Sequence, residues 1–196
     1  MSIYFTHHKG ETKLSKDEME GLYSTHVLTI HDLDILEQRN IEHGFNWLKK
    51  HEQQNPLTVE FVLHLHKHLF GEVWKWAGLY RRSEKNIGIN PNLVPIELYK
   101  LLQNTNFWIE NKTYSWNEIM ARFHHRFVQI HPFPNGNGRI ARILVEHLCR
   151  KYKYSIPHWR SDIQDGDQRR SVYLEALREA DQHHYSKLIE FLSHHK

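Results

Sequence analysis

Apolar residues recur at helical spacing along most of the chain. Between residues 32 and 50, and again between 58 and 70, they return every three or four positions, which places them on one face of a helix. Asn55-Pro56 separates the two segments, and Thr58 is a residue type that caps helices. The same spacing predicts further helices over residues 98–109, 115–130, 140–148, 169–180 and 185–192.

Residues 71–92 break this helical pattern. Trp74, Trp76 and Tyr80, followed by Ile87 and Ile89, place aromatic and β-branched residues around glycines and a polar turn. This arrangement predicts a short β-hairpin, which on the local pattern alone is a plain connection. We therefore expect an all-α fold with one small hairpin.

The length and composition fit one globular domain. The chain has 196 residues, of which 39% are hydrophobic, enough to bury a core. Residues 1–30 are polar and mixed, and Ser15 and Glu18 have the spacing of a capping box for a short helix. We expect a partly ordered N-terminal extension over 1–30, followed by the domain over 31–196.

The charge and cysteine content exclude several classes of protein. A net charge of +3 with 25% charged residues favours neither a nucleic-acid binder nor a protein of the membrane surface. No apolar run is long enough for a signal peptide or a membrane span. The single cysteine, Cys149, cannot form an internal disulfide. These features predict a cytoplasmic protein.

Histidine is unusually frequent, with 18 residues. His64 and His68 are four residues apart and could share a helix face as metal ligands do, but no third ligand follows at a diagnostic spacing. His66 falls on the apolar stripe of its helix, which favours a buried histidine with satisfied hydrogen bonds. We interpret these histidines as structural.

The stretch from His131 to Arg142 has the features of a polyphosphate site. It reads His-Pro-Phe-Pro-Asn-Gly-Asn-Gly-Arg-Ile-Ala-Arg. Glycine and asparagine tolerate positive φ, so the backbone N–H groups can turn inward toward an anion. The apolar residues that follow indicate a helix, whose N-terminus carries a partial positive charge suited to phosphate.

Three side chains add chemistry to this stretch. Arg139 and Arg142 are three residues apart, hence neighbours on the helix, and guanidinium groups match phosphate oxygens. His131 is the one side chain of the stretch that exchanges a proton near neutral pH, which makes it a candidate general base. A solvated charge is the plain alternative for either arginine alone.

The stretch resembles the signature of the Fic family, HxFx(D/E)GNGRxxR. Its Pro134-Asn135 variant is similar to the Fic subfamily called mobile mystery protein B. The resemblance implies the Fic fold and adenylylation, the transfer of AMP from ATP to a hydroxyl of a target protein. In that reaction His131 would be the general base, and Phe133 would fix the loop from behind.

The resemblance also implies which residues bind the phosphates. Gly136, Asn137 and Gly138 would present backbone N–H groups, and Asn137 its amide as well. Arg139 would bind the β-phosphate and Arg142 the γ-phosphate. Gly138 stands where the Doc branch of the family has a lysine and transfers phosphate, so nucleotide transfer is favoured.

Asn135 departs from the family pattern, which has a carboxylate that ligates Mg²⁺ at this position. An amide oxygen ligates a hard cation without formal charge, so affinity for Mg²⁺, or for Mn²⁺ in its place, should fall. Three outcomes stay open: turnover with a metal held mainly by ATP and Asn135, a slower or different transfer, or nucleotide binding without turnover.

The resemblance further implies a flap over the active site. Trp76-Ala77-Gly78, Arg81 and Ile87-Gly88 are similar to the Fic flap, whose edge pairs with the backbone of the target protein. The adenine pocket is less defined. Trp159 and Tyr173 could stack on a base, although a core role is favoured for each.

Fic enzymes are often held inactive by a glutamate that pairs with the second motif arginine, within the pattern (S/T)xxxE(G/N). Ser171 with Glu175 and Ser186 with Glu190 have this spacing but are followed by the wrong residues, and packing explains both. Glu37 is a looser candidate for autoinhibition, and a separate antitoxin protein is equally open. Two alternatives to an enzyme remain: a Fic-derived nucleotide-binding module, and an all-α scaffold without a nucleotide site.

Overall fold

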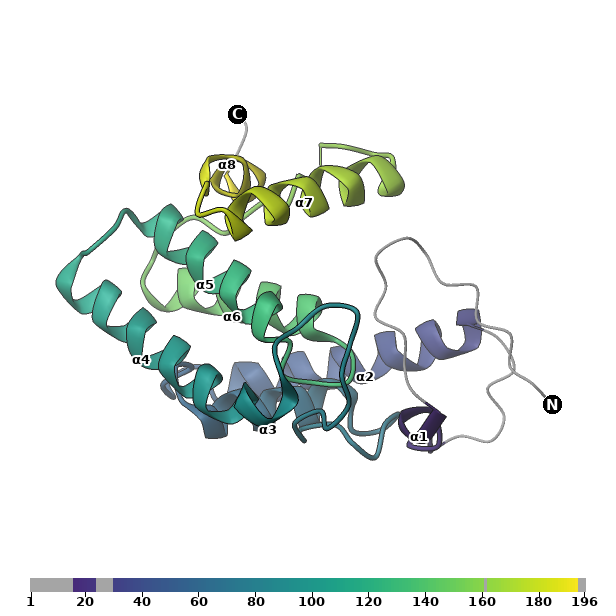
Figure 1. Ribbon diagram of the computed structural model, residues 1–196. Helices are drawn as coiled ribbons and strands as arrows, with labels where there is room; N and C mark the ends of the chain where they lie inside the picture. Colours follow the sequence, from purple (N-terminus) through teal and green to yellow (C-terminus); the bar gives the residue numbers. More distant parts are fainter. Residues whose placement is uncertain (1–15, 24–29, 161, 194–196) are drawn as a thin grey trace.

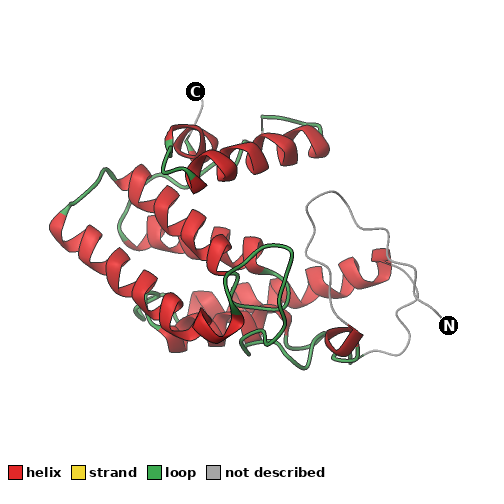
Figure 2. Ribbon diagram, viewed as in Figure 1, coloured by secondary structure: helices red, strands yellow, loops and turns green. Residues whose placement is uncertain are grey.

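The computed structural model describes residues 16–23, 30–160 and 162–193. Within these ranges the chain is helical (Figures 1 and 2), and the only β-type pairing is a single bridge between Leu22 and Trp74. The predicted all-α class is confirmed. The elements are α1 Lys16–Met19, α2 Ile30–Lys50, α3 Val59–Phe70, the 3₁₀ turn η1 Pro91–Leu93, α4 Val94–Asn111, α5 Trp116–Ile130, α6 Asn137–Lys151, α7 Gly166–Asp181 and α8 Ser186–Leu192.

Side-chain caps set the starts of α3 and α5. The Thr58 hydroxyl accepts from Phe61 N at the start of α3, as predicted. The Ser115 hydroxyl accepts from Glu118 N at the start of α5, which is one half of the predicted capping box. The Glu118 carboxylate instead accepts from Arg122 one turn further along. Each cap satisfies a backbone donor that the helix leaves without a partner.

Helix α5 is the central element. It packs against α4, α6, α7 and α8, while α2 and α3 form an antiparallel pair that contacts this group through α4 and through side chains of α6 (Figure 1). Helices α5 and α6 run side by side and are connected by residues 131–136, which we call the motif loop. Two packed helices therefore hold both ends of this loop.

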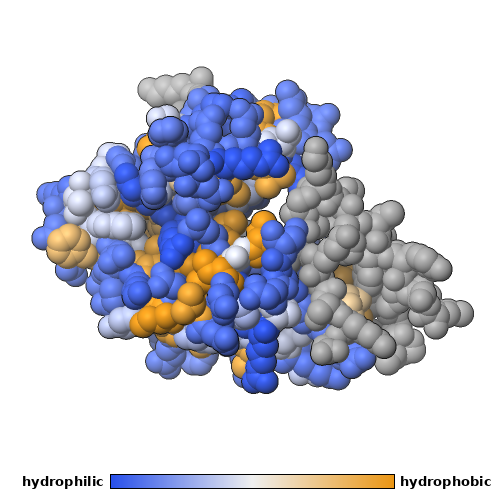
Figure 3. Space-filling model, in the orientation of Figure 1, coloured by the Kyte–Doolittle hydropathy of each residue, from blue (hydrophilic) through white to orange (hydrophobic). Residues whose placement is uncertain are grey.

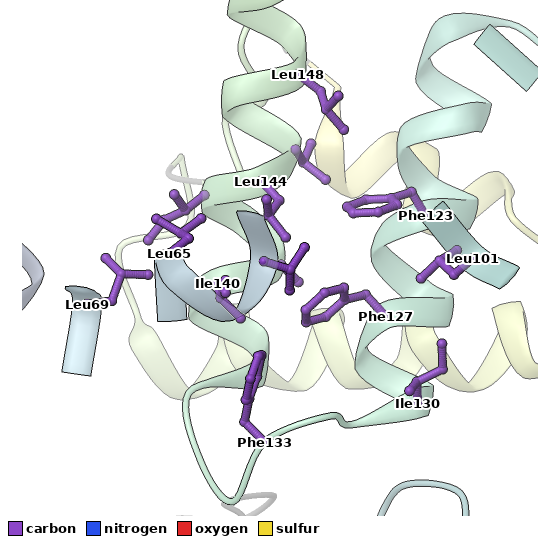
Figure 4. Close-up of a cluster of buried hydrophobic side chains, with 14 of the residues drawn as sticks. Leu65, Leu69, Leu101, Phe123, Phe127, Ile130, Phe133, Ile140, Leu144 and Leu148 are labelled. Atoms are coloured by element: carbon purple, nitrogen blue, oxygen red, sulfur yellow. The ribbon is translucent and has the colours of Figure 1, made fainter. Parts of the chain in front are cut away.

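The hydrophobic core lies between α3, α4, α5 and α6 and extends to the motif loop. Figure 4 shows the Phe133 side chain pointing from the loop into this cluster, toward Ile140 of α6 and Phe127 of α5. Phe133 has no exposed surface. Burial of one phenylalanine stabilises a fold by about 2–3 kcal/mol, so the loop is anchored in the core.

The predicted β-hairpin over residues 71–92, which we call the flap segment, is wrong. Apart from the bridge at Trp74 and the start of η1 at Pro91, these residues form turns, bends and irregular loop. Hydrogen bonds to distant segments take the place of a strand ladder, since Arg81 N donates to Pro132 O of the motif loop at 2.9 Å. The Arg81 guanidinium also donates to Ile89 O, so a side chain joins the two arms of the segment.

The described part of the N-terminal region packs on the flap segment. Tyr23 N donates to Val73 O, and Lys75 N donates to Gly21 O. The Glu18 carboxylate accepts from Ser83 Oγ at 2.7 Å and pairs with Lys85. Ser15 lies outside the described residues, and the domain boundary at residue 30 stays a prediction. None of the described helices is long and apolar enough to cross a membrane.

Candidate active site

The motif loop begins where α5 ends. His131 has left-handed backbone angles (φ 54°, ψ 61°), which terminate the helix, and its N–H donates to Phe127 O at 3.0 Å. A non-glycine residue in this region of φ/ψ space is uncommon and is held there by its surroundings. Arg81 supplies part of that support, because its Nε donates to His131 O at 2.6 Å.

Asn137 closes the motif loop on itself. Its side-chain oxygen accepts from Phe133 N at 2.9 Å, and its side-chain nitrogen donates to Phe133 O at 2.8 Å. Asn137 is buried, with 2% of its surface exposed. The expected contact of this amide with phosphate therefore does not match its place in the structure: the amide is used inside the loop, and only the backbone N–H of Asn137 lies at the helix start.

The imidazole of His131 bonds a backbone carbonyl of α5. Its Nδ1 lies 3.3 Å from Val128 O. A carbonyl can only accept, so Nδ1 carries the proton and Nε2 carries the lone pair of the neutral ring. Burial lowers the pKa of His131 to about 4; the positive charges of Arg81 and Lys85 add to this, and the Val128 bond opposes it. At neutral pH His131 is therefore a proton acceptor at Nε2.

Two glycines shape the start of α6. Gly136 has φ +80°, and a Cβ there would lie 2.7 Å from the Phe70 ring, so no larger residue fits. A Cβ on Gly138, by contrast, would meet no atom within 4 Å. Open space thus lies beside Gly138 in the first turn of α6, where backbone N–H groups have no intrahelical acceptor.

Arg139 is held by residues from α3 and α2. Its guanidinium lies over the Phe70 ring at 4.7 Å and pairs with the Glu37 carboxylate. Glu37 is buried and also accepts from Trp74 Nε1 at 2.6 Å. Glu37, which the sequence indicated loosely as an inhibitory residue, thus lies at the site. It pairs with Arg139, the first motif arginine, rather than with Arg142, the second.

Arg142 lies between two aromatic rings. Its guanidinium is 5.0 Å from the centre of the Tyr173 ring and 5.4 Å from that of Trp159. Tyr173 is buried and its hydroxyl bonds His124 Nε2 at 2.9 Å. Trp159 and Tyr173 therefore pack around the arginine, which agrees with the core role favoured for them over adenine stacking.

The residues around Asn135 do not fit a resident Mg²⁺ or Mn²⁺ ion. The Asn135 side-chain oxygen accepts from Gly136 N at 2.6 Å, so the one predicted ligand is neutral and already bonded. Among the described residues no group of three or more histidine, cysteine or acidic side chains could hold a metal ion. Mg²⁺ sites in proteins commonly rely on carboxylates and substrate phosphates, and this loop provides no carboxylate.

The flap segment packs directly against His131. A Cβ on Gly88, which has φ +116°, would lie 3.0 Å from His131 Cβ and 2.7 Å from Arg81 Nη2. Arg81 was expected on a target-facing edge, but its side chain is buried and braces the loop from inside. Ile87 is 42% exposed, and Gly88 is exposed as well, so these two of the predicted flap residues face solvent.

Three residues that shape the site were not singled out as site residues from the sequence. Phe70 supports Arg139 and limits Gly136, Trp74 shares the Glu37 carboxylate, and His66 donates from Nε2 to Asn135 O at 3.1 Å. His66 was predicted as a satisfied core histidine, and this is confirmed. Phe70 and Trp74 gave no signal beyond being large apolar residues near glycines.

Comparison with known proteins agrees with this geometry. Residues 56–149 match the Fic/DOC family. A protein named protein adenylyltransferase Fic from Drosophila willistoni is 29% identical over 149 residues, which is 72% of this chain and 28% of that protein. The chain thus spans less than a third of the length of this relative.

Solved structures share the fold. The N-terminal Fic domain of Bep8 from Bartonella sp. 1-1C superposes with a TM-score of 0.70 at 14% identity, covering 92% of this chain and 94% of that one. BepC from Bartonella tribocorum, solved with bound AMPPNP, gives a TM-score of 0.64 at 19% identity, covering 93% of this chain and all of that one. Residues 56–149 therefore match the Fic/DOC family, and the fold is that of solved Fic domains. The curated relatives of this chain are named adenylyltransferases.

Proposed function

We propose that this chain transfers AMP from ATP to a side-chain hydroxyl of a target protein. His131 Nε2 takes the hydroxyl proton while the hydroxyl oxygen forms a bond to the α-phosphorus of ATP. The bond from the α-phosphorus to the oxygen that bridges to the β-phosphate breaks, and pyrophosphate leaves. The negative charge of the leaving group faces the N-terminus of α6 together with Arg139 and Arg142.

One observation supports this function above the others. A neutral imidazole, oriented by Val128 O, directly precedes a helix N-terminus that has open space at Gly138 and arginines on its first turns. A proton acceptor and an anion-binding helix end are the two groups that attack of a hydroxyl on a phosphate needs. A scaffold without a nucleotide site would need neither.

Radiolabel transfer tests the proposal. ATP labelled at the α-phosphate, with Mg²⁺ or Mn²⁺ and a cell lysate, should label a protein band, while γ-labelled ATP should not. His131→Ala should lower the signal by about 10²- to 10⁴-fold. His64→Ala, on an exposed face of α3, is the matched control and should keep full activity. No α-label under either metal would contradict the proposal, and γ-label alone would indicate phosphate transfer.

The second candidate is a nucleotide-binding module without turnover. It is favoured by the bond of the Asn135 side chain to Gly136 N, which leaves the loop without an anionic metal ligand. In this case ATP binds, and binding is lost in Arg139→Ala, but no product forms. Asn135→Asp distinguishes the two functions, since it should create transfer activity only in a protein that lacked it.

We further propose that the target protein docks along the flap segment. Exposed apolar side chains favour this docking surface. Ile87 is 42% exposed and Leu79 is 59% exposed, and Leu93 and Ile96 at the start of α4 are exposed as well. Figure 3 shows apolar side chains gathered over the first half of α4, beside the flap segment of Figure 1. A separate inhibitory protein and a cytoplasmic location stay predictions.

A further inference from the structure

His66 of α3 joins the motif loop to the flap segment. Its ring is fully buried. Nδ1 accepts from Gly78 N at 2.9 Å, and Nε2 lies 3.1 Å from Asn135 O. A backbone N–H can only donate and a carbonyl can only accept, so the proton is on Nε2 and the lone pair on Nδ1. One neutral tautomer therefore satisfies both segments.

The same ring is packed against the loop it bonds. It stacks on Phe133 with 3.7 Å between ring centres and an angle of 15° between planes, and it contacts Phe70 at 4.8 Å. Burial lowers the pKa of His66 to about 3; the Asn135 bond opposes this shift and the Arg139 charge adds to it. The ring thus stays neutral, and its position is fixed by aromatic packing as well as by hydrogen bonds.

The bond to Asn135 O controls the first peptide unit of the anion site. The Asn135 carbonyl and the Gly136 N–H belong to one planar peptide, in which the two groups point in opposite directions. Holding the carbonyl toward His66 therefore sets the direction of the Gly136 N–H, which lies at the start of α6. Gly136 is at φ +80°, a residue type with wide backbone freedom, and its N–H is also held by the Asn135 side-chain oxygen at 2.6 Å, so His66 restrains the same peptide from its carbonyl side.

We propose that His66 is a positioning residue for the nucleotide site: through Nε2 it fixes the Asn135–Gly136 peptide, and through Nδ1 it ties the flap segment to the same point. This inference rests on the proposed function, because it assigns His66 to the phosphate-binding loop of that reaction. It differs from a purely structural role in one respect. The two ring nitrogens should have separable effects, with Nε2 setting nucleotide affinity and Nδ1 setting the position of the flap segment.

Two conservative variants separate the nitrogens. His66→Gln places an amide nitrogen near the position of Nε2 and keeps the donor to Asn135 O. His66→Asn places a side-chain atom near Nδ1 and keeps the acceptor for Gly78 N. Both lose part of the stacking on Phe133, so both should lower the melting temperature of the full chain to a similar extent.

Binding of AMPPNP measured by calorimetry gives the first readout. We expect His66→Gln to bind within about threefold of the parent chain and His66→Asn to bind about tenfold more weakly. His147 is the matched control: it is another buried histidine, stacked on Phe61 at 5.7 Å near the far end of α6. His147→Gln and His147→Asn should leave affinity unchanged. Equal affinities for the two His66 variants, or affinity that follows melting temperature in all four, would overturn the proposal.

Nucleotide-free NMR gives a readout that does not depend on the proposed function. The Gly136 amide signal should shift in His66→Asn and stay near its parent position in His66→Gln, while the Gly78 amide should show the reverse. The same amide pattern in both variants would overturn the assignment of the nitrogens. If the parent chain binds no AMPPNP, the proposed function fails, and the amide pattern still decides whether His66 positions the loop.

Discussion

The motif loop and the flap segment meet at His131 but are stabilised in different ways. The motif loop is closed on itself by Asn137, which bonds both backbone groups of Phe133, and residues 131–134 are buried, with added bonds from Arg81 and His66. The flap segment is braced from outside, by Arg81 bonding to the end of α5 and by Glu18 bonding to Ser83, and its Ile87 is exposed. The loop is therefore built to keep one geometry, and the flap segment to depend on its neighbours.

Lowering the pH should weaken the flap segment and the motif loop together, because protonation of His66 at Nδ1 removes the bond that it accepts from Gly78 N. The pKa values of His66 and His131 are lowered to about 3 and about 4, against an ordinary value of 6.5. At a pH between the lowered pKa and the ordinary pKa of 6.5, the unfolded chain binds more protons than the folded one. The free energy of unfolding is therefore full above pH 6.5 and falls as the pH drops toward 4. Each histidine should lose roughly 1 kcal/mol between pH 7 and pH 5.5.

Urea unfolding at several pH values measures this loss, and hydrogen exchange locates it. His66→Gln should remove the contribution of His66 and flatten the curve. The Gly78 amide of the flap segment and the amides of the motif loop should lose protection over the same pH range. A free energy of unfolding that is constant from pH 7 to 5.5 would contradict the assignment of neutral buried imidazoles.

Asn137→Ala should destabilise the fold by about 2 kcal/mol, because it leaves Phe133 N and Phe133 O buried without partners. It should also abolish AMPPNP binding, since the loop loses its internal closure. Asn111→Ala is the matched control: its amide also donates to the carbonyl four residues earlier, at 2.9 Å, but at an exposed helix end. Denaturant unfolding should show that the control loses less than about 1 kcal/mol of its free energy of unfolding. Equal losses in both variants would mean that the motif loop is no better braced than a surface turn.

Glu37→Gln should raise AMPPNP affinity about threefold to tenfold, because it removes the acidic competitor for Arg139. The glutamine oxygen can still accept from Trp74 Nε1, so the packing is kept. Glu97→Gln, which weakens an ion pair with Arg126 between α4 and α5, is the control and should leave affinity unchanged. Unchanged or weaker binding in Glu37→Gln would contradict an inhibitory role of this pair.

Ser83→Ala should have the smallest effect. It should lower the free energy of unfolding by less than about 1 kcal/mol, since it removes one half-buried hydrogen bond to Glu18. Hydrogen exchange in the flap segment should become faster, while AMPPNP affinity and loop exchange stay the same. Slower transfer to target protein with unchanged nucleotide binding would agree with flap docking. A change in the motif loop would show that the two regions are coupled more tightly than their contacts suggest.

The same contrast explains what the sequence could predict. The helices and the motif loop follow from local spacing: apolar residues three or four apart, Thr58 and Ser115 as caps, and glycines before α6. The bracing by Asn137 spans four residues and could have been found by the same reasoning, yet its amide was assigned to phosphate. Local patterns thus gave the right backbone and left side-chain partners open.

The flap segment could not be predicted, because its partners are distant in sequence. Its aromatic and β-branched residues have strand propensity, but Arg81 bonding to His131 O and Pro132 O overrides this preference. Glu37 shows the same limit. Its sequence neighbourhood identified it only loosely, whereas its contact with Arg139 depends on how α2 packs on α3.

A crystal structure of the chain with a non-hydrolysable ATP analogue tests the central claim most directly. We expect the triphosphate at the open first turn of α6, with phosphate oxygens within hydrogen-bond reach of the N–H groups of residues 136–138. The α-phosphorus should leave room for a hydroxyl within about 3–3.5 Å of both it and His131 Nε2. An analogue bound away from α6, or a first turn of α6 closed by side-chain packing with His131 turned from the nucleotide, would contradict the account.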